Sequence, residues 1–361
     1  MAVAWIGNRE AQLQDAAGET AKLLQSSRCP VFSFDTDVHG TRAAIALAER
    51  VGAAYDHIDG AVLAHETALF TDRGGMTVAP GEARRRADVV VVVGELPKAY
   101  GRFLLELAAT KPDLPVAGER AFFSVGDVTP ALDGKREATP LVCEGQGLAA
   151  TLAALRGRCA GRQVSAPVKN FEKFAAALAK ARYPVFFYSG QSAAALALEM
   201  LQGLISDLNA TGRASGLLLP ASEGGWGAAL ASGWMTGFPP RTGFGRGFPE
   251  HDPWRFDVAR MIADGEADCH VWISDDPQRR PPKATNGCAL IACVRTDGPV
   301  AGAAVTIGIG QAGLDHDGVV YSAQVGTLIA VDGSSRSDSV AAADILRAIA
   351  AGVEAEAALP C

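Results

Sequence analysis

Two short segments of the chain carry the same run of apolar residues, each between stretches with helical spacing. Cys29-Pro-Val-Phe-Ser-Phe34 and Tyr183-Pro-Val-Phe-Phe-Tyr188 lie 154 residues apart, and each follows a stretch rich in Ala, Leu and Lys. The stretches that come next place apolar residues on one face of a helix. These positions are Ala44, Leu47, Ala48 and Val51 in the first copy and Ala197, Met200, Leu201, Leu204 and Leu208 in the second. Each copy therefore predicts a helix, a strand and a second helix.

A second pair of segments repeats in the same order. Ala87-Asp88 precedes five valines that end at Val93, and Ala267-Asp268 precedes a similar apolar run that ends at Ile273, 180 residues later. Proline follows four residues after each run. Five consecutive valines have no helical or alternating period and are typical of a parallel strand buried on both faces.

The two repeats predict an α/β protein of two related Rossmann-like lobes with mostly parallel sheets. We expect the first lobe in residues 1–165 and the second in residues 166–300, with residues 301–361 adding C-terminal strands and a helix that complete the core. The run 222–250 is rich in Gly, Pro and aromatic residues without a period, which predicts a long binding or interface loop. The segment 226–254 is thus the first candidate for a cavity or an interface.

The composition of the chain argues against nucleic-acid binding, membrane binding and cysteine-ligated metal sites. The chain has 361 residues, of which 48% are hydrophobic and 20% charged, as in a well-packed protein of two lobes. A net charge of -7 gives no attraction to nucleic acid or to anionic membranes. The seven cysteines form no C-x-x-C pair, so they indicate buried thiols in a reducing compartment rather than zinc or iron–sulfur ligands. No charged leader and no long apolar span occurs, and we therefore expect a cytoplasmic protein.

Two glycine-containing turns are candidates for nucleotide or anion binding. Gly308-Ile-Gly310-Gln-Ala-Gly313 matches the dinucleotide fingerprint, but a turn and a strand follow it where a helix is needed to hold pyrophosphate. Ser189-Gly190-Gln191-Ser192 lies between a predicted strand and helix, at the edge where open α/β sheets bind ligands. These four residues are possible ligand-binding residues, and a helix cap without a ligand is the alternative.

Other polar clusters have simpler interpretations. Asp35, Asp37 and His39 follow a predicted strand and could contact a metal, but a role as helix cap is favoured because no second cluster supplies further ligands. The arginines 84–86 indicate a solvated helix end. A lone histidine such as His65, beside an apolar run, is more often structural than catalytic. No serine-hydrolase elbow, zinc-protease motif or P-loop lysine motif occurs.

The segment from Glu82 to Pro97, with the stretch 60–75 before it, resembles molybdopterin oxidoreductases and more closely the B subunit of formylmethanofuran dehydrogenase. Further matching segments follow in order along most of the chain. They are Ser206-Asp-Leu-Asn209, Thr236-Gly-Phe-Pro239, Gly265-Glu-Ala-Asp268, Ser274-Asp-Asp-Pro277 and Gly318-Val-Val-Tyr321. The resemblance implies two α/β lobes of the molybdopterin oxidoreductase type, which would explain the internal repeat.

The sequence departs from the catalytic relatives at the positions that matter for their chemistry. Where the resemblance implies a cysteine or selenocysteine before a histidine, this chain has Ala64 before His65. A methyl group cannot ligate molybdenum or tungsten, so both positions are interpreted as vestigial. The relatives' cysteine-rich segment for a [4Fe–4S] cluster has no counterpart at the start of the sequence, and their Tyr-Arg-Met-Asp type stretch is replaced by Tyr321-Ser-Ala-Gln324. We therefore expect no catalytic residue, no metal, no molybdopterin and no iron–sulfur cluster in this chain.

This pattern is similar to the B subunits of formyltransferase/hydrolase complexes from methylotrophic bacteria. The resemblance implies a non-catalytic scaffold in one-carbon metabolism. The complex would move a formyl group from tetrahydromethanopterin to a methanofuran-type carrier, which the whole complex binds, and hydrolyse it to formate. The implied partners are an amidohydrolase-like A subunit, a C subunit and a formyltransferase D subunit. Two alternatives stay open: a working molybdenum- or tungsten-pterin enzyme with His65 as ligand, and a nucleotide-binding module that uses residues 189–192.

Overall fold

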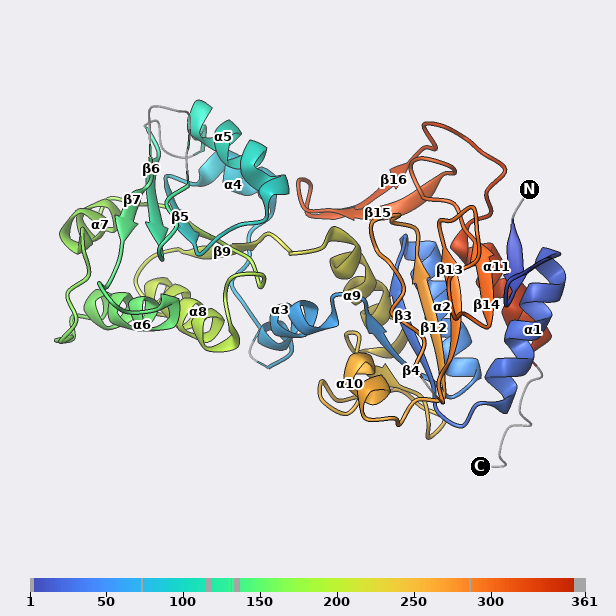
Figure 1. Ribbon diagram of the computed structural model, residues 1–361. Helices are drawn as coiled ribbons and strands as arrows, with labels where there is room; N and C mark the ends of the chain where they lie inside the picture. The colour runs from blue at the N-terminus through green and yellow to red at the C-terminus, as the bar shows by residue number, and fades with distance from the viewer. Residues whose placement is uncertain are drawn as a thin grey trace. The chain divides into compact units, whose positions relative to one another are not determined.

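The computed structural model describes residues 3–72, 74–114, 119–130, 132, 137–285 and 287–353, and these form two compact units. Unit 1 comprises Met1–Ala64, Ser222–Tyr321 and Leu328–Cys361. Unit 2 comprises His65–Ala221 and Ser322–Thr327. Figure 1 traces the chain through both.

The central feature of unit 1 is a nine-stranded sheet in the order β11-β10-β4-β3-β12-β13-β14-β1-β2, as far as the structure describes the chain. The strands from β4 to β14 in this order are parallel, and antiparallel strands extend both edges. The strands are β1 (Ala4–Ile6), β2 (Arg9–Ala11), β3 (Pro30–Asp35), β4 (Ala54–His57), β10 (Thr242–Gly243), β11 (Glu250–His251), β12 (Cys269–Ser274), β13 (Ala289–Val294) and β14 (Val305–Gly308). Strands β15 (Gly318–Ser322) and β16 (Thr327–Val331) form a separate pair.

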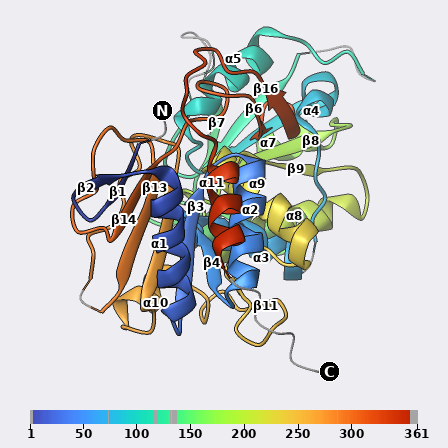
Figure 2. The same cartoon turned by 90° about the vertical axis from the view of Figure 1, so that its right-hand side faces the viewer.

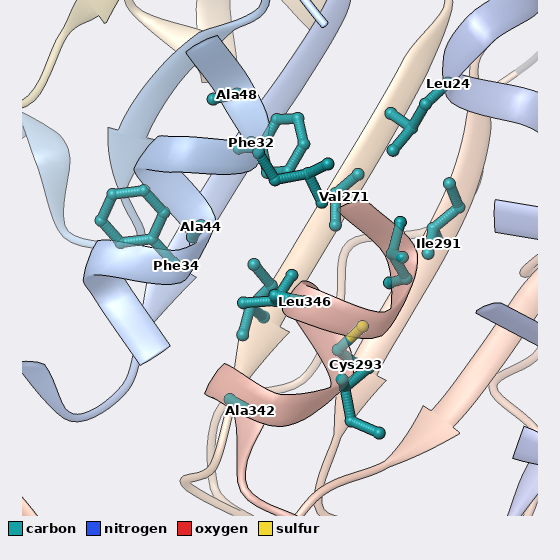
Figure 3. Packing of buried hydrophobic residues seen from close by; sticks show 14 of the residues in the cluster. Leu24, Phe32, Phe34, Ala44, Ala48, Val271, Ile291, Cys293, Ala342 and Leu346 are labelled. Atoms are coloured by element: carbon teal, nitrogen blue, oxygen red, sulfur yellow. The ribbon is translucent and has the colours of Figure 1, made fainter. Parts of the chain in front are cut away.

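Helices cover both faces of the sheet in unit 1. Helices α1 (Leu13–Ser26), α2 (Val38–Arg50) and α11 (Ala342–Gly352) lie side by side over one face (Figure 2). They bury alanine and leucine side chains against Phe32, Phe34 and their neighbours on β12 and β13 (Figure 3). Because side chains alternate along a strand, Val31 faces the opposite side, where it packs with helix α10 (Val258–Ala263). Strand β14 and helix α11, from the C-terminal segment, thus belong to the core of unit 1.

Unit 2 is built on a five-stranded sheet in which every pairing is parallel, in the order β7-β6-β5-β8-β9. Helices α6 and α8 pack on one face, and α5 lies on the other (Figure 1). The strands are β5 (Val89–Val93), β6 (Ala121–Val125), β7 (Thr139–Leu141), β8 (Pro184–Tyr188) and β9 (Ser215–Leu218). The helices are α4 (Pro80–Arg86), η1 (Lys98–Tyr100), α5 (Gly101–Ala109), α6 (Leu148–Cys159), α7 (Phe171–Leu178) and α8 (Ala195–Asn209), and α3 (Gly60–Asp72) carries the chain from unit 1 into unit 2. Predictions of an α/β fold, parallel sheets and a buried valine strand are confirmed.

The internal repeat predicted from the sequence extends to strand register and hydrogen bonding. Strand β12 pairs with β3 from the first residue of each, and β5 pairs with β8 in the same way. Asp268, directly before β12, accepts hydrogen bonds from the backbone N–H groups of Arg28 and Cys29 at 2.8 and 3.0 Å. Asp88, directly before β5, accepts the equivalent bonds from Arg182 and Tyr183 at 2.6 and 3.0 Å. The Ala-Asp motif thus ties each strand to the start of its neighbour.

The expected lobe boundaries at 165 and 300 do not coincide with the two units. Each sheet takes one strand from each copy of the repeat, since β3 pairs with β12 and β5 pairs with β8. Unit 2 is therefore inserted in the chain between the two parts of unit 1 that pair with each other. Sequence similarity identified equivalent strands but could not show which strands are neighbours.

The expectation of a long loop over 222–250 is wrong for its first part, where helix α9 (Glu223–Thr236) forms. Ser222 caps the helix by accepting a hydrogen bond from the Gly225 N–H at 3.0 Å. The buried side of α9 consists of small residues, Gly225, Gly227, Ala228, Ala231 and Ser232, and the helix packs against α2. Small residues allow this close packing but give no hydrophobic period, which is why the helix was missed.

No helix in the described ranges is long and apolar enough to cross a membrane. Six cysteines are free thiols, and Cys361 lies outside the described residues. Burial raises the pKa of the Cys293 thiol to about 12, as expected for an inert side chain within the core.

Candidate functional site

The vestigial metal-site positions lie on helix α3. Ala64 is half-buried, His65 is exposed and the next residue, Glu66, is buried. Consecutive residues of an α-helix point about 100° apart, which follows from 3.6 residues per turn, so one residue faces solvent and the next faces inward. The helix thus presents the His65 imidazole to solvent, beside a position that carries only a methyl group.

Glu66 is the buried carboxyl group of this region, and no sequence motif marks it. Its Oε1 accepts hydrogen bonds from the backbone N–H groups of Gly190 at 2.9 Å and Ala221 at 3.1 Å. Burial raises the pKa of Glu66 to about 7, although both hydrogen bonds act in the opposite direction. A Cβ at Gly190 would lie 2.4 Å from Glu66 Cγ, so this turn requires glycine. Glu66 therefore holds the turns after β8 and β9 together.

The possible ligand-binding turn Ser189–Ser192 lies at the carboxyl end of β8, where it was predicted. Several of its polar groups have partners within the chain. Besides the Gly190 bond, the Gln191 N–H donates to Ser189 Oγ at 3.3 Å, and Ser192 Oγ donates to the Glu95 carbonyl at 2.7 Å. The arrangement matches a turn braced by side chains, and ligand binding by these residues stays a prediction.

The residues after β3 act as the helix cap that was favoured from sequence. Asp37 Oδ1 accepts a hydrogen bond from the Gly40 N–H at 2.8 Å and so caps α2. Asp35 Oδ1 lies 3.4 Å from His57 Nε2. Both aspartates line a cavity of about 250 Å³ together with Tyr321, the first residue of the altered Tyr-Arg-Met-Asp type stretch. This cavity lies at the carboxyl edge of the unit 1 sheet.

Asp275 lies in the same cavity and was not identified as a site residue. Burial, together with the nearby charges of Asp35 and Asp37, raises the pKa of Asp275 to about 7. Thr36 Oγ1 donates a hydrogen bond to it at 3.3 Å. A signal was present in the sequence, because Asp275 is the counterpart of Glu95 in the repeat at an offset of 180 residues, but the repeat says nothing about burial.

Two other sequence candidates are structural. Gly308 ends β14, and a turn leads from there to β15 without the helix that a pyrophosphate site needs. A Cβ at Gly310 would lie 2.9 Å from Ser339 Cβ, so this glycine allows close packing of two loops. The arginines 84–86 lie in the last turn of α4 and pair with acidic side chains, with 2.9 Å between Arg84 Nε and Glu106 Oε1. They form the solvated helix end that was predicted.

Comparison with known proteins places the chain in a family. No protein-family model matches it. It is 34% identical over 336 residues to the B subunit of the formyltransferase/hydrolase complex Fhc of Methylorubrum extorquens, covering 92% of this chain and 91% of that protein. The chain therefore belongs to the family of Fhc B subunits. A chain in the X-ray crystal structure of the formyltransferase/hydrolase complex FhcABCD from Methylorubrum extorquens, in complex with methylofuran, is 33% identical and superposes with a TM-score of 0.88 over 97% of this chain and 98% of that chain.

In this member of the Fhc B-subunit family, the residues present do not fit a molybdenum or tungsten centre at α3. Ala64 has no donor atom, so the position before His65 supplies no ligand to a soft metal. Among the residues that the structure describes, no three His, Cys, Asp or Glu side chains converge so that they could hold a metal ion. The absence of metal, pterin and iron–sulfur cluster from the native protein stays a prediction.

Proposed function

We propose that this chain is a non-catalytic scaffold within a formyltransferase/hydrolase complex. The observation that carries the proposal is Ala64, a methyl group in the ligand position implied by the resemblance, in a chain that matches an Fhc B subunit over 92% of its length. The complex would pass a formyl group from tetrahydromethanopterin to a methanofuran-type carrier and release formate. The transfer and hydrolysis sites would reside on partner subunits.

The proposed partners are the amidohydrolase-like A subunit, the C subunit and the formyltransferase D subunit. The carrier would be bound by the assembled complex. The two α/β units would be lobes of the molybdopterin oxidoreductase type, kept because a fold can outlive its site when partners still bury its surface. The shared register of β3–β12 and β5–β8 supports this relationship between the lobes. A cytoplasmic location is part of the same proposal.

Co-expression with candidate partner chains tests the proposal. A tagged chain should purify with all three partners in a fixed ratio, and the assembly should convert formyl-tetrahydromethanopterin to formate. Omitting this chain should prevent assembly, while the isolated chain should have no formyltransferase or hydrolase activity. A chain that purifies alone and is not needed for the assembly of the others would contradict the scaffold role.

A second candidate is a working metal-pterin enzyme that uses His65 as its ligand. The observation in its favour is that the His65 side chain is exposed and so accessible to a ligand. Elemental analysis distinguishes the two, because this candidate requires stoichiometric molybdenum or tungsten. A nucleotide module at residues 189–192 is less favoured, since N–H groups of that turn already have acceptors in Glu66 and Ser189. Titration with purine nucleotides tests it.

A further inference from the structure

The two sheets provide an internal comparison of equivalent positions. Because β3, β4 and β12 share their register with β8, β9 and β5, each residue in one set has a counterpart in the other. On one face of the unit 2 sheet the central positions are apolar and buried, and Phe103 of α5 packs on Phe187 with ring centroids 5.8 Å apart. These central positions are Val90, Val92, Phe187 and Leu217. This face is an ordinary hydrophobic core.

The equivalent positions in unit 1 carry polar side chains instead. They are His270, Trp272, Ser33 and Asp56, in the same order. Three of them are almost fully buried, with exposed fractions of 4% for His270, 6% for Ser33 and 4% for Asp56. Burial of polar groups costs free energy that hydrogen bonds within the protein offset only in part, so these residues do not stabilise the sheet better than the apolar residues of unit 2 would.

These polar side chains line a cavity of about 320 Å³ beneath helix α10. The cavity has apolar walls, formed by Ile58, Val258, Ile262 and Pro282. A cavity of this size, mostly apolar with a few convergent polar groups, is typical of a site for a small organic molecule.

The hydrogen-bonding groups of the cavity favour a ligand with an acceptor atom. His270 Nε2 and Ser33 Oγ share a hydrogen bond of 3.0 Å. Burial lowers the pKa of His270 to about 4, which keeps the ring neutral at physiological pH. The indole Nε1 of Trp272 is buried without an acceptor among the described residues. An unpaired buried donor is unfavourable, and a ligand acceptor that reached Nε1 would remove that cost.

The charges of the cavity disfavour an anion. Arg241 Nε lies 3.1 Å from Asp56 Oδ2, and its Nη2 lies 2.8 Å from Asp257 Oδ2. Two carboxylates thus surround one guanidinium group, which leaves no net positive charge for a carboxylate or phosphate. Burial raises the pKa of Asp56 to about 6 against the influence of Arg241, which leaves the carboxylate mainly ionised at pH 7.

We propose that this cavity binds a small uncharged molecule with an apolar body and a carbonyl or related hydrogen-bond acceptor. The apolar body would pack between α10 and the sheet, and the acceptor would face Trp272, Ser33 and His270. This binding function is separate from the scaffold role and would stand without it.

Tryptophan-labelled protein gives a direct test, because the chain has only five tryptophans and hence five indole N–H signals. The full chain labelled with ¹⁵N-tryptophan is titrated with benzamide and cyclohexanecarboxamide, and with benzoate and cyclohexanecarboxylate as charged controls of the same shape. Trp272→Phe identifies the signal of interest. We expect the amides to shift the Trp272 signal in a saturable way and the carboxylates to leave it in place. Amides without effect, or carboxylates with an equal effect, would overturn the proposal.

Two exposed alanines of helix α10 provide a matched pair of variants that leave the core intact. Ala259 lines the cavity, whereas Ala263 does not. Ala259→Phe should fill the space and weaken amide binding by roughly tenfold or more, equivalent to about 1.4 kcal/mol. Ala263→Phe should leave the affinity unchanged. Equal effects of the two substitutions would show that the amides bind elsewhere.

Discussion

Replacement of Gly190 by alanine tests the contact that organises the carboxyl edge of the unit 2 sheet. The added Cβ would lie 2.4 Å from Glu66 Cγ and 2.9 Å from its Oε1. Glu66 is buried and its carboxylate accepts two backbone hydrogen bonds, so it cannot move aside without losing them. Either the turn after β8 shifts or the carboxylate leaves its partners.

The expected cost of Gly190→Ala is about 2 kcal/mol. Overpacking of a buried site typically costs about 1–3 kcal/mol. Loss of a hydrogen bond to a charged group adds about 1.5–3 kcal/mol where the bond breaks. Reduced entropy of the unfolded chain offsets this by about 0.4–1 kcal/mol. The steric cost therefore decides whether the substitution lowers or raises the free energy of unfolding.

The assay must report on unit 2. All five tryptophans, at positions 5, 226, 234, 254 and 272, lie in unit 1, so tryptophan fluorescence does not follow unfolding of unit 2. Urea denaturation followed by far-UV circular dichroism, with calorimetry to separate transitions, measures the free energy of unfolding of both units.

A matched control and a rescue variant separate crowding from other effects. A Cβ at Gly101, in helix α5 of unit 2, would meet no atom within 4 Å, so Gly101→Ala should stabilise the protein by about 0.5–1 kcal/mol. Combining Glu66→Ala with Gly190→Ala should remove most of the cost of the glycine substitution, with a coupling energy above about 1 kcal/mol. A cost below about 0.5 kcal/mol for Gly190→Ala, or an undiminished cost beside Glu66→Ala, would refute the reasoning.

Three further predictions concern the same residues and their surroundings. The pKa of Glu66 in the folded protein is raised from 4.5 to about 7. The protein should therefore lose about 3 kcal/mol of its free energy of unfolding as the pH rises from 4.5 through 7. Glu66→Gln, which cannot ionise, should remove this loss in denaturation curves measured across that range. Asp268→Ala leaves two backbone N–H groups without their acceptor and should destabilise unit 1 by about 1.5–3 kcal/mol, measured by tryptophan fluorescence. The control Asp264→Ala removes an exposed partner of Arg260 and should cost less than about 1 kcal/mol. His65→Ala should leave formyl transfer by an assembled complex unchanged, and lost activity with assembly intact would contradict a vestigial role.

The elements with a strong local pattern could be predicted from the sequence. The valine run of β5 and the repeated Pro-Val-Phe segments have the continuous apolar pattern that is typical of buried parallel strands, and the structure has strands there. Helix α9 could not be predicted in this way, because its buried side is made of Gly, Ala and Ser and its close packing depends on α2. The order of strands in each sheet depends on pairings between distant residues, such as Cys269 with Pro30, which no local pattern encodes.

In the candidate site, too, the sequence predicts features with a local pattern and does not predict those that depend on distant residues. The position of Ser189–Ser192 at the end of a strand followed from the order of elements, and so did the capping role of Asp37. The roles of Glu66 and Asp275 could not be predicted, because burial and partners distant in sequence set the pKa of each carboxyl group. The cavity under α10 could not be predicted either, because the strand register that brings Ser33 and His270 together depends on residues far apart in the sequence.

The central claim, that Ala64 marks a chain without its own metal-pterin centre, is tested most directly by elemental analysis of the native complex. The complex is purified from cells grown with molybdate and tungstate, and both metals are measured by mass spectrometry together with formyltransferase/hydrolase activity. We expect full activity with molybdenum and tungsten far below stoichiometric amounts. Stoichiometric molybdenum or tungsten bound to this chain in the active complex would contradict the claim.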